Sequence, residues 1–464
     1  MRDIHYQRIS EIHTAYRKRK ISPVEVTRQL LDRIERFDPE LRAFVFVAGD
    51  LAIEEAKKAE RELLFEGIDR GPLHGIPIAL KDVCDTSDMP TAGGMPRLKN
   101  RVPAKDATVV QRLRCNGAIL LGKLRMSEAA TLAHHPEIRN PLNAWDRLLW
   151  TGGSSSGAGT AVAAGLCFVA VGSDTAGSIL FPAACSNVVG LRPTWGRVSR
   201  HGILALGKTR DTVGPLARNA RDAAILMKAI AGADPQDVTT VRDEVPDYER
   251  LIRGSLNGLS IGFDPDLIDQ MENDDSRRRI LEALDAFVDA GVEIRAIALP
   301  SLEDYSRRLA PLAAAETAAA HAHSFPLYRD EYGPVLRLRL DNAFEVRADQ
   351  IAEAVATREE LKSLISGLFQ QVSLLLLPIF WGEIPSWERI KELEDSGGGN
   401  VLPPYCLISS ACGLPAVAIP CGIGESLLPY GFQLVGKRLE EGLLLKACAA
   451  FEGRSQCDRR HPSI

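Results

Sequence analysis

Two short loops of small and hydroxyl-bearing residues, together with one lysine, suggest the chemistry of this chain. Residues 152–157 are Gly-Gly-Ser-Ser-Ser-Gly, and residues 172–178 are Gly-Ser-Asp-Thr-Ala-Gly-Ser. Lys81 directly follows the apolar run at residues 76–80. A serine hydroxyl can be activated as a nucleophile by a neighbouring amine, without a histidine. The set therefore predicts a hydrolase that attacks an amide or a related acyl bond.

Lys81 has two interpretations from the sequence. In the first, it ends a buried strand and its ammonium group extends into solvent. In the second, the side chain is buried, and burial lowers its pKa from about 10.4 toward neutrality. Only the neutral amine can accept a proton from a hydroxyl group. The two loops favour the second interpretation.

Each loop has features of a polar site. Residues 158–170 follow the first loop and predict a buried helix, so this loop would lie at a helix N-terminus with unpaired backbone N–H groups. The second loop follows an apolar strand predicted at residues 168–171. Its small residues allow several N–H groups to point at one spot, which is how an oxyanion hole is built.

With these motifs the sequence resembles the amidase signature family. The resemblance rests on three motifs in the family's order: Gly-Ile-Pro-x-x-x-Lys-Asp at 75–82, the loop at 152–157, and Gly-Ser-Asp-Thr-x-Gly-Ser-x-x-x-Pro-Ala at 172–183. Supporting matches lie at 140–141, 190–194, 196–199, 211–215, 413–416 and 431–436, so the resemblance extends from about residue 20 to about residue 450. It implies an α/β fold in which helices cover both faces of a central mixed β-sheet.

The resemblance also implies a catalytic triad. Ser178 would be the nucleophile, Ser154 the bridging serine after a cis peptide bond, and Lys81 the base. The backbone N–H groups of Thr175, Ala176, Gly177 and Ser178 would form the oxyanion hole. Ser155, Ser156 and Asp174 would support these groups by hydrogen bonds, and neither a cofactor nor a metal ion is expected.

Three positions depart from the family's pattern. Ala176 stands where glycine is usual, Leu180 where arginine is common, and Gly94 where serine is frequent. The missing arginine removes a partner for a salt bridge or for an anionic substrate. None of the changes removes a triad residue, so we expect an active enzyme, but its substrate does not follow from those of its relatives.

The rest of the chain predicts one structural domain. Residues 1–70 are expected to form a helical segment that packs on the core, with a helix beginning at Ser22-Pro23. Residues 71–464 would form the α/β domain, with a helical elaboration around 300–400. Strands are predicted near 76–80, 118–121, 168–171, 260–263, 374–377, 416–420 and 432–435; helices near 50–66, 220–232, 276–290, 313–321, 345–370 and 440–452; and a mobile loop at 397–400.

Composition limits the partners and the location. The net charge is −5 and the pI is near 6.1, which gives no basic surface for nucleic acid or an anionic membrane. No apolar run approaches the about 20 residues of a membrane span. Nine cysteines without a Cys-x-x-Cys pair, and a start that lacks a secretory leader, predict free thiols in the cytoplasm.

Three other motifs point to different chemistry. Residues 202–209 match the phosphate-loop pattern, but His201 and the preceding residues are no buried strand, and Gly214 and Pro215 oppose a following helix. Ser155 fits the nucleophile elbow of α/β-hydrolases, which needs a later Asp and His. The adjacent His134 and His135 do not share a helix face, so we favour a structural role over a metal site.

The function predicted from the sequence is amide hydrolysis of a small molecule by a cytoplasmic homodimer. The alternative is the glutaminase (A-type) subunit of a tRNA-dependent amidotransferase, in which a partner subunit binds the tRNA. An α/β-hydrolase esterase and an inactive binding protein on this scaffold are two further alternatives. Specificity would come from residues 120–145, 300–345 and 375–405, where Trp381 and Trp387 would either line an acyl pocket or pack in the core.

Overall fold

One mixed β-sheet of eleven strands forms the centre of the computed structural model, which describes residues 3–395, 402–423, 428–455 and 460–464. The strands are β1 (Phe44–Val47), β2 (Pro77–Lys81), β3 (Ile119–Leu124), β4 (Val169–Asp174), β5 (Val189–Arg192), β6 (Thr212–Ala217), β7 (Ser260–Phe263), β8 (Glu293–Ala296), β9 (Leu374–Pro378), β10 (Ala416–Ile423) and β11 (Pro429–Gly436). Their order in the sheet is β1-β3-β2-β4-β6-β5-β10-β11-β9-β7-β8. Parallel pairs such as β2–β4 occur beside antiparallel pairs such as β4–β6. The predicted mixed sheet is confirmed.

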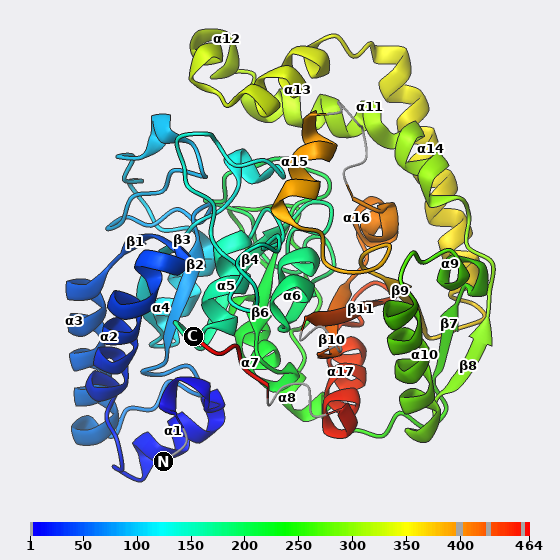
Figure 1. Cartoon of the computed structure of the whole chain (residues 1–464). Coiled ribbons are helices and arrows are strands. Elements are labelled where there is room, and N and C mark those ends of the chain that lie inside the picture. Colours follow the sequence, from blue (N-terminus) through cyan, green and yellow to red (C-terminus); the bar gives the residue numbers. More distant parts are fainter. Residues whose placement is uncertain (1–2, 396–401, 424–427, 456–459) are drawn as a thin grey trace.

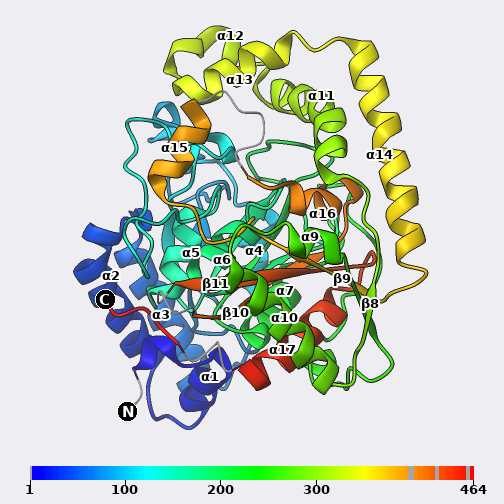
Figure 2. The same cartoon turned by 45° about the vertical axis from the view of Figure 1, so that its right-hand side comes forward.

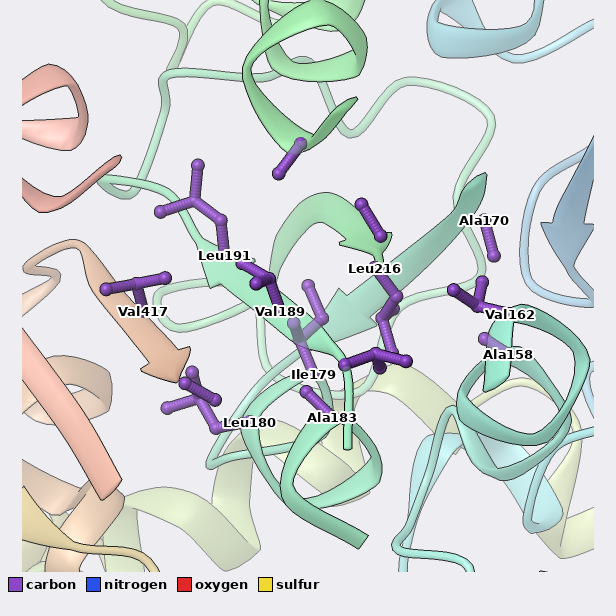
Figure 3. Packing of buried hydrophobic residues seen from close by; sticks show 14 of the residues in the cluster. Ala158, Val162, Ala170, Ile179, Leu180, Ala183, Val189, Leu191, Leu216 and Val417 are labelled. Atoms are coloured by element: carbon purple, nitrogen blue, oxygen red, sulfur yellow. The ribbon is translucent and has the colours of Figure 1, made fainter. Parts of the chain in front are cut away.

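Helices cover both faces of this sheet. In Figure 3, α5 and α6 lie on one side of β4, β5 and β6, and the green helix α7 lies on the other. Buried side chains from α5 and α6, among them Val162 and Ala183, fill the space beneath the strands. The helices around the sheet are α4 (Thr108–Cys115), α5 (Ser156–Ala163), α6 (Leu180–Ser186), α7 (Ala220–Ile230), α8 (Tyr248–Leu251), α9 (Pro265–Asp269), α10 (Asp274–Asp289) and α17 (Glu441–Ser455).

The N-terminal residues add helices and one strand at the edge of the sheet (Figure 1). The helices are α1 (Ile9–Arg17), α2 (Pro23–Leu41) and α3 (Gly49–Arg61). Helix α2 begins as predicted, because Ser22 and Glu25 bond each other's backbone N–H groups. Strand β1 pairs antiparallel with β3 and was not predicted. Its four residues lie between two strong helical patterns, so its alternation is too short to detect.

A group of helices from residues 302–412 lies at one end of the molecule, far from α1 (Figures 1 and 2). These helices are α11 (Leu302–His321), α12 (Phe325–Tyr328), α13 (Pro334–Phe344), α14 (Ala348–Leu368), α15 (Trp387–Asp395) and α16 (Leu407–Cys412). We call α11 to α14 the helical cap. It corresponds to the elaboration predicted around 300–400. The loop predicted at 397–400 lies outside the described residues.

Two local differences from the prediction affect the site. The helix predicted at 158–170 ends at Ala163, because Gly165 adopts a left-handed conformation (φ 66°) that stops it. Strand β4 continues to Asp174, so the second loop begins inside the sheet. Among the described residues, no helix has both the length and the hydropathy required to cross a membrane.

Candidate active site

Lys81 is the last residue of β2, between β3 and β4 in the middle of a buried region of the sheet. Its side chain has no exposed surface, so the interpretation as a solvent-facing lysine is wrong. The Nζ atom donates to the Oγ of Ser154 over 2.6 Å and to the Oγ of Ser173 over 2.9 Å. The carbonyl oxygen of Ser173 is a third acceptor at 3.3 Å. The sheet therefore holds the amine against two hydroxyl groups.

Burial lowers the pKa of Lys81 to about 7, although the negative charges of Asp174 and Asp211 act in the opposite direction. Desolvation dominates because, among the described residues, no carboxylate contacts the amine directly. A substantial fraction of Lys81 is therefore neutral near physiological pH. In this state the amine can accept a proton from the hydroxyl it contacts.

Ser154 follows two glycines in a tight turn before α5. The Gly153–Ser154 peptide bond is cis. Gly152 has φ 76°, and a Cβ atom there would lie 2.4 Å from the backbone nitrogen of Pro182, so this position requires glycine. The N–H of Ser155 donates to the carbonyl of Ser178 over 3.3 Å, which joins the two loops.

Ser178 lies between β4 and α6, at the N-terminal end of a buried helix. Its exposed fraction is 6%, whereas the neighbouring Ala176 is exposed. Within the described residues the Ser178 hydroxyl has no hydrogen-bond partner, so no competing acceptor holds it. Solvent thus reaches the loop on the side of Ala176, beside a free hydroxyl group.

The backbone N–H groups of the second loop fall into two sets. Those of Thr175, Ala176 and Ser178 have no acceptor in the described part of the chain. The N–H of Gly177 donates to Asp174 Oδ1 over 2.8 Å, and that of Ile179 donates to Asp174 Oδ2 over 2.7 Å. Three of the four donors predicted for an oxyanion hole are therefore unengaged, and the Asp174 carboxylate binds the fourth.

Asp174 is itself held by a cation from another strand. Arg192, at the end of β5, donates to Asp174 Oδ1 over 2.6 Å, and neither side chain is exposed. Leu180, the position at which the sequence departs from the family's arginine, is a fully buried apolar residue of α6. The buried salt bridge at Asp174 is formed by Arg192, which lies in the match at 190–194 but was given no role from the sequence.

The other predicted supporting residues contact neighbouring groups. Ser155 Oγ donates to the carbonyl of Ser173 over 3.2 Å, and Ser156 Oγ lies 3.2 Å from Nε2 of His134. Burial lowers the pKa of His134 to about 3, so the ring is neutral. Ser173, which contacts Lys81, was also missed; its place on the strand next to β2 is the signal that could have found it.

The helical cap reaches the second loop through the segment before β6. Thr175 Oγ1 donates to Asp211 Oδ1 over 2.6 Å. The adjacent Arg210 donates to Glu316 of α11 over 2.8 Å. A side chain from the cap is thus connected to the loop of Ser178 through two neighbouring residues.

The alternative motifs have little structural support. Segment 202–209 contains no helix and does not follow a strand of the sheet, unlike a phosphate loop. The described residues contain no group of three or more potential metal ligands. Trp381 packs partly buried against the main core, and the ring of Trp387 lies 6.0 Å from that of His134. The Trp387 ring is thus near the first loop.

Comparisons with known proteins agree with this arrangement. The model of the family described as Amidase matches residues 25–445. The protein named AmiD of Mycobacterium tuberculosis (strain ATCC 25618 / H37Rv) is 37% identical over 98% of this chain and 96% of its own length. The A-type subunit of the glutamyl-tRNA(Gln) amidotransferase of Geobacter sp. (strain M21) is 32% identical over 97% of both chains.

A solved structure supports the same assignment. The native peptide amidase of Stenotrophomonas maltophilia superposes with a TM-score of 0.82 at 28% identity, covering 98% of each chain. The family match covers most of the chain, and the similarities to AmiD and to the amidotransferase protein extend over nearly its whole length. The chain therefore belongs to the amidase signature family, and it is an enzyme that hydrolyses an amide C–N bond.

Proposed function

We propose that the chain cleaves a carboxamide bond of a small molecule through an acyl-enzyme on Ser178, with Ser154 and Lys81 as the proton relay. The observation that carries the proposal is the 2.6 Å contact between Nζ of the fully buried Lys81 and Oγ of Ser154. Burial lowers the pKa of this lysine to about 7, which makes the amine a usable base.

In the first half of the reaction, neutral Lys81 takes the proton of the Ser154 hydroxyl. The Ser178 hydroxyl, which has no hydrogen-bond partner among the described residues, turns toward Ser154 and gives it its proton. The Ser178 oxygen then forms a bond to the carbonyl carbon of the amide. Collapse of the tetrahedral intermediate breaks the C–N bond, and Ser154 returns a proton to the leaving amine. The products of this half are the acyl-enzyme and ammonia or an amine.

In the second half, water attacks the acyl-enzyme and the same relay removes its proton. The carboxylic acid leaves and the Ser178 hydroxyl is regenerated. In both halves the negative oxygen would be held by the backbone N–H groups of Thr175, Ala176 and Ser178, which have no acceptor within the described residues. The N–H of Gly177 donates to Asp174, so it would stabilise the negative oxygen only as a donor shared between the two acceptors.

A fluorophosphonate probe tests the proposed nucleophile. We expect intact-mass analysis to show one adduct, and peptide mapping to place it on Ser178. Lys81→Ala is expected to abolish labelling, while Cys115→Ala, a change at an exposed surface position, leaves it unchanged. An adduct on Ser155 would contradict the proposed roles, since it would indicate a nucleophile elbow in place of the relay.

A second candidate function is the glutaminase component of an amidotransferase. The observation that favours it is the 32% identity to the A-type subunit of glutamyl-tRNA(Gln) amidotransferase over 97% of both chains. Glutamine is itself a small carboxamide, so both candidates use the same chemistry. Turnover of simple amides by the isolated chain supports the first function. Turnover of glutamine that requires copurified partner proteins supports the second.

The assembly and location of the enzyme are part of the proposal. We propose a cytoplasmic homodimer with no cofactor, which acts without contacting nucleic acid or a membrane. Light scattering during gel filtration measures the mass against the 50.6 kDa of one chain. A mass of one chain at working concentrations would contradict the homodimer.

A further inference from the structure

We propose that Arg192 is a positioning residue of the catalytic centre: through Asp174 it fixes the loop that carries Ser178, and it offsets the negative charge that Asp174 presents to Lys81. The inference rests on the proposed roles of Ser178 and Lys81. It adds a residue from a different strand, β5, to the groups that determine the activity.

Arg192 contacts Asp174, at the start of the loop of Ser178, and Arg210, in the segment before β6. Its Nη1 atom donates to Oδ1 of Asp174 over 2.6 Å and to the carbonyl oxygen of Asp174 over 2.9 Å. Its Nη2 atom donates to the carbonyl of Arg210 over 2.8 Å. Both Arg192 and Asp174 are fully buried, so solvent does not screen the pair. A charge-assisted bond in such surroundings holds its geometry well.

Asp174 transmits this geometry to the residues on either side of Ser178. One carboxylate oxygen accepts from the N–H of Gly177, and the other accepts from the N–H of Ile179. The orientation of the carboxylate therefore determines the path of the backbone through Ser178. Within the described residues, Arg192 is the one cation that forms an ion pair with Asp174. Removing the guanidinium would leave the carboxylate held, among the described residues, by these two N–H groups alone.

The same pair affects the base. Asp174 and Asp211 are the carboxylates whose negative charges favour the ammonium form of Lys81, while burial raises the pKa of the nearby Cys84 thiol to about 12 and keeps it neutral. Asp211 is held by the Thr175 hydroxyl and by two backbone N–H groups, and Arg210 lies nearby. Asp174 has the guanidinium of Arg192 directly on its carboxylate. An Asp174 carboxylate without this cation would favour protonated Lys81 and so remove the base.

The test measures the rate of fluorophosphonate labelling of Ser178 as a function of pH. In the wild type the labelling rate should rise with pH as Lys81 loses its proton, and we call this rise the acidic limb. We expect Arg192→Gln to shift the acidic limb toward higher pH by about one unit, because the charge of Asp174 is then unpaired. We also expect its labelling rate to fall about 100-fold, because the loop loses its anchor. Asp174→Asn should shift the limb in the opposite direction, since it removes the negative charge.

Arg197→Gln is the matched control. Arg197 is also buried, but it donates to the carbonyls of Asp243 and Glu244 and to the Tyr248 hydroxyl. Its loss is expected to lower the thermal stability while the acidic limb stays in place. Arg192→Lys keeps the charge but loses the fork of donors. It should label Ser178 more slowly with an unmoved limb, and it serves as the test if Arg192→Gln does not fold.

Three outcomes would overturn the inference. The first is a folded Arg192→Gln enzyme whose acidic limb and labelling rate equal those of the wild type. The second is an acidic limb that moves in the same direction in Arg192→Gln and Asp174→Asn, and the third is an Arg192→Lys enzyme that is labelled at the wild-type rate. Failure of the proposed function gives a different result, in which the wild-type enzyme itself forms no adduct on Ser178.

Discussion

Thr175 Oγ1 donates a hydrogen bond to Asp211 Oδ1 over 2.6 Å, and both residues are buried. The two carboxylate oxygens of Asp211 also accept from the N–H groups of Leu206 and Gly207. Asp211 thus joins the segment before β6 to the first residue of the loop that carries Ser178. The position of the Thr175 N–H, an expected oxyanion donor, depends on this bond.

Replacing Thr175 by valine tests this dependence. The change keeps the shape of the side chain and removes its hydroxyl group, so we expect kcat/KM to fall about tenfold, the equivalent of one buried hydrogen bond. KM should change little, because the bond orients a group that acts on the transition state. Thr209→Val is the control, since Thr209 lies in the same segment but bonds Arg358 of α14. Equal activity in the two variants would contradict the role of Thr175.

The pH dependence of the reaction follows from Lys81. Burial lowers its pKa from 10.5 to about 7, and only the neutral amine can accept the proton of Ser154. We therefore expect kcat/KM to rise with pH through about 7 and to level off above it. A pH–rate profile on an amide substrate measures this limb. A limb near the ordinary lysine pKa would mean that Lys81 is not desolvated in the working enzyme.

The sequence motifs predicted the local structure around the proposed site residues better than the contacts among these residues. The apolar run before Lys81 and the small residues of both loops follow from local patterns, and the structure has a strand and two turns at these places. The contact between Lys81 and Ser173 depends on the pairing of β2 with β4, about 90 residues apart. No local pattern contains that register, and so Ser173 was missed.

The same reasoning applies to Arg192 and to the short strands. The sequence shows that Leu180 lacks the family's charge, but it does not show that Arg192 of β5, which lies between β6 and β10 in the sheet, pairs with Asp174. Strands of four residues give few alternations, and among them β7 was predicted at 260–263 whereas β1 and β5 were not. Tertiary pairing determines β1 and β5, so they appear only in the structure.

Gly177 and Ala176 provide a contrast within one loop. Gly177 has φ 104°, and a Cβ atom there would lie 2.4 Å from the ring of Phe181 and 2.9 Å from Sγ of Cys406. We expect Gly177→Ala to displace Ser178, to lower the rate of probe labelling at least 100-fold and to cost about 1 to 3 kcal/mol of stability. Labelling kinetics and denaturant unfolding measure the two effects.

Ala176→Gly is the matched change in the same loop. Ala176 is exposed, and its backbone already accommodates a Cβ atom. Its replacement by the family's glycine should keep labelling within a few-fold of the wild type and cost at most about 1 kcal/mol. If Gly177→Ala behaved like Ala176→Gly, the loop would tolerate side chains at both positions, and the steric account of Gly177 would be wrong.

Glu128 connects the region of the first loop to the helical cap. Its carboxylate accepts from the N–H of Gly333, the residue before α13, at 3.0 and 3.2 Å, and its exposed fraction is 2%. The preceding residue, Ser127, donates its N–H to the carbonyl of Ser154 over 3.3 Å. Glu128 therefore lies where the cap meets the turn of Ser154, without a cation bound to its carboxylate in the described part of the chain.

Burial raises the pKa of Glu128 from 4.5 to about 7. The folded protein then binds more protons than the unfolded chain between these values, so the stability from this group falls as pH rises from 4.5 to 7. Above pH 7 the full cost of burying the carboxylate remains. We expect Glu128→Gln, which keeps an oxygen acceptor for Gly333, to raise the unfolding free energy by about 1 to 3 kcal/mol at pH 8 and much less at pH 5.

Denaturant unfolding at both pH values tests this prediction for Glu128, with Glu137→Gln, at an exposed position, as the control. A Glu128→Gln protein that is less stable than the wild type at pH 8 would show that the charge itself holds the cap, through its attraction to the N-terminus of α13.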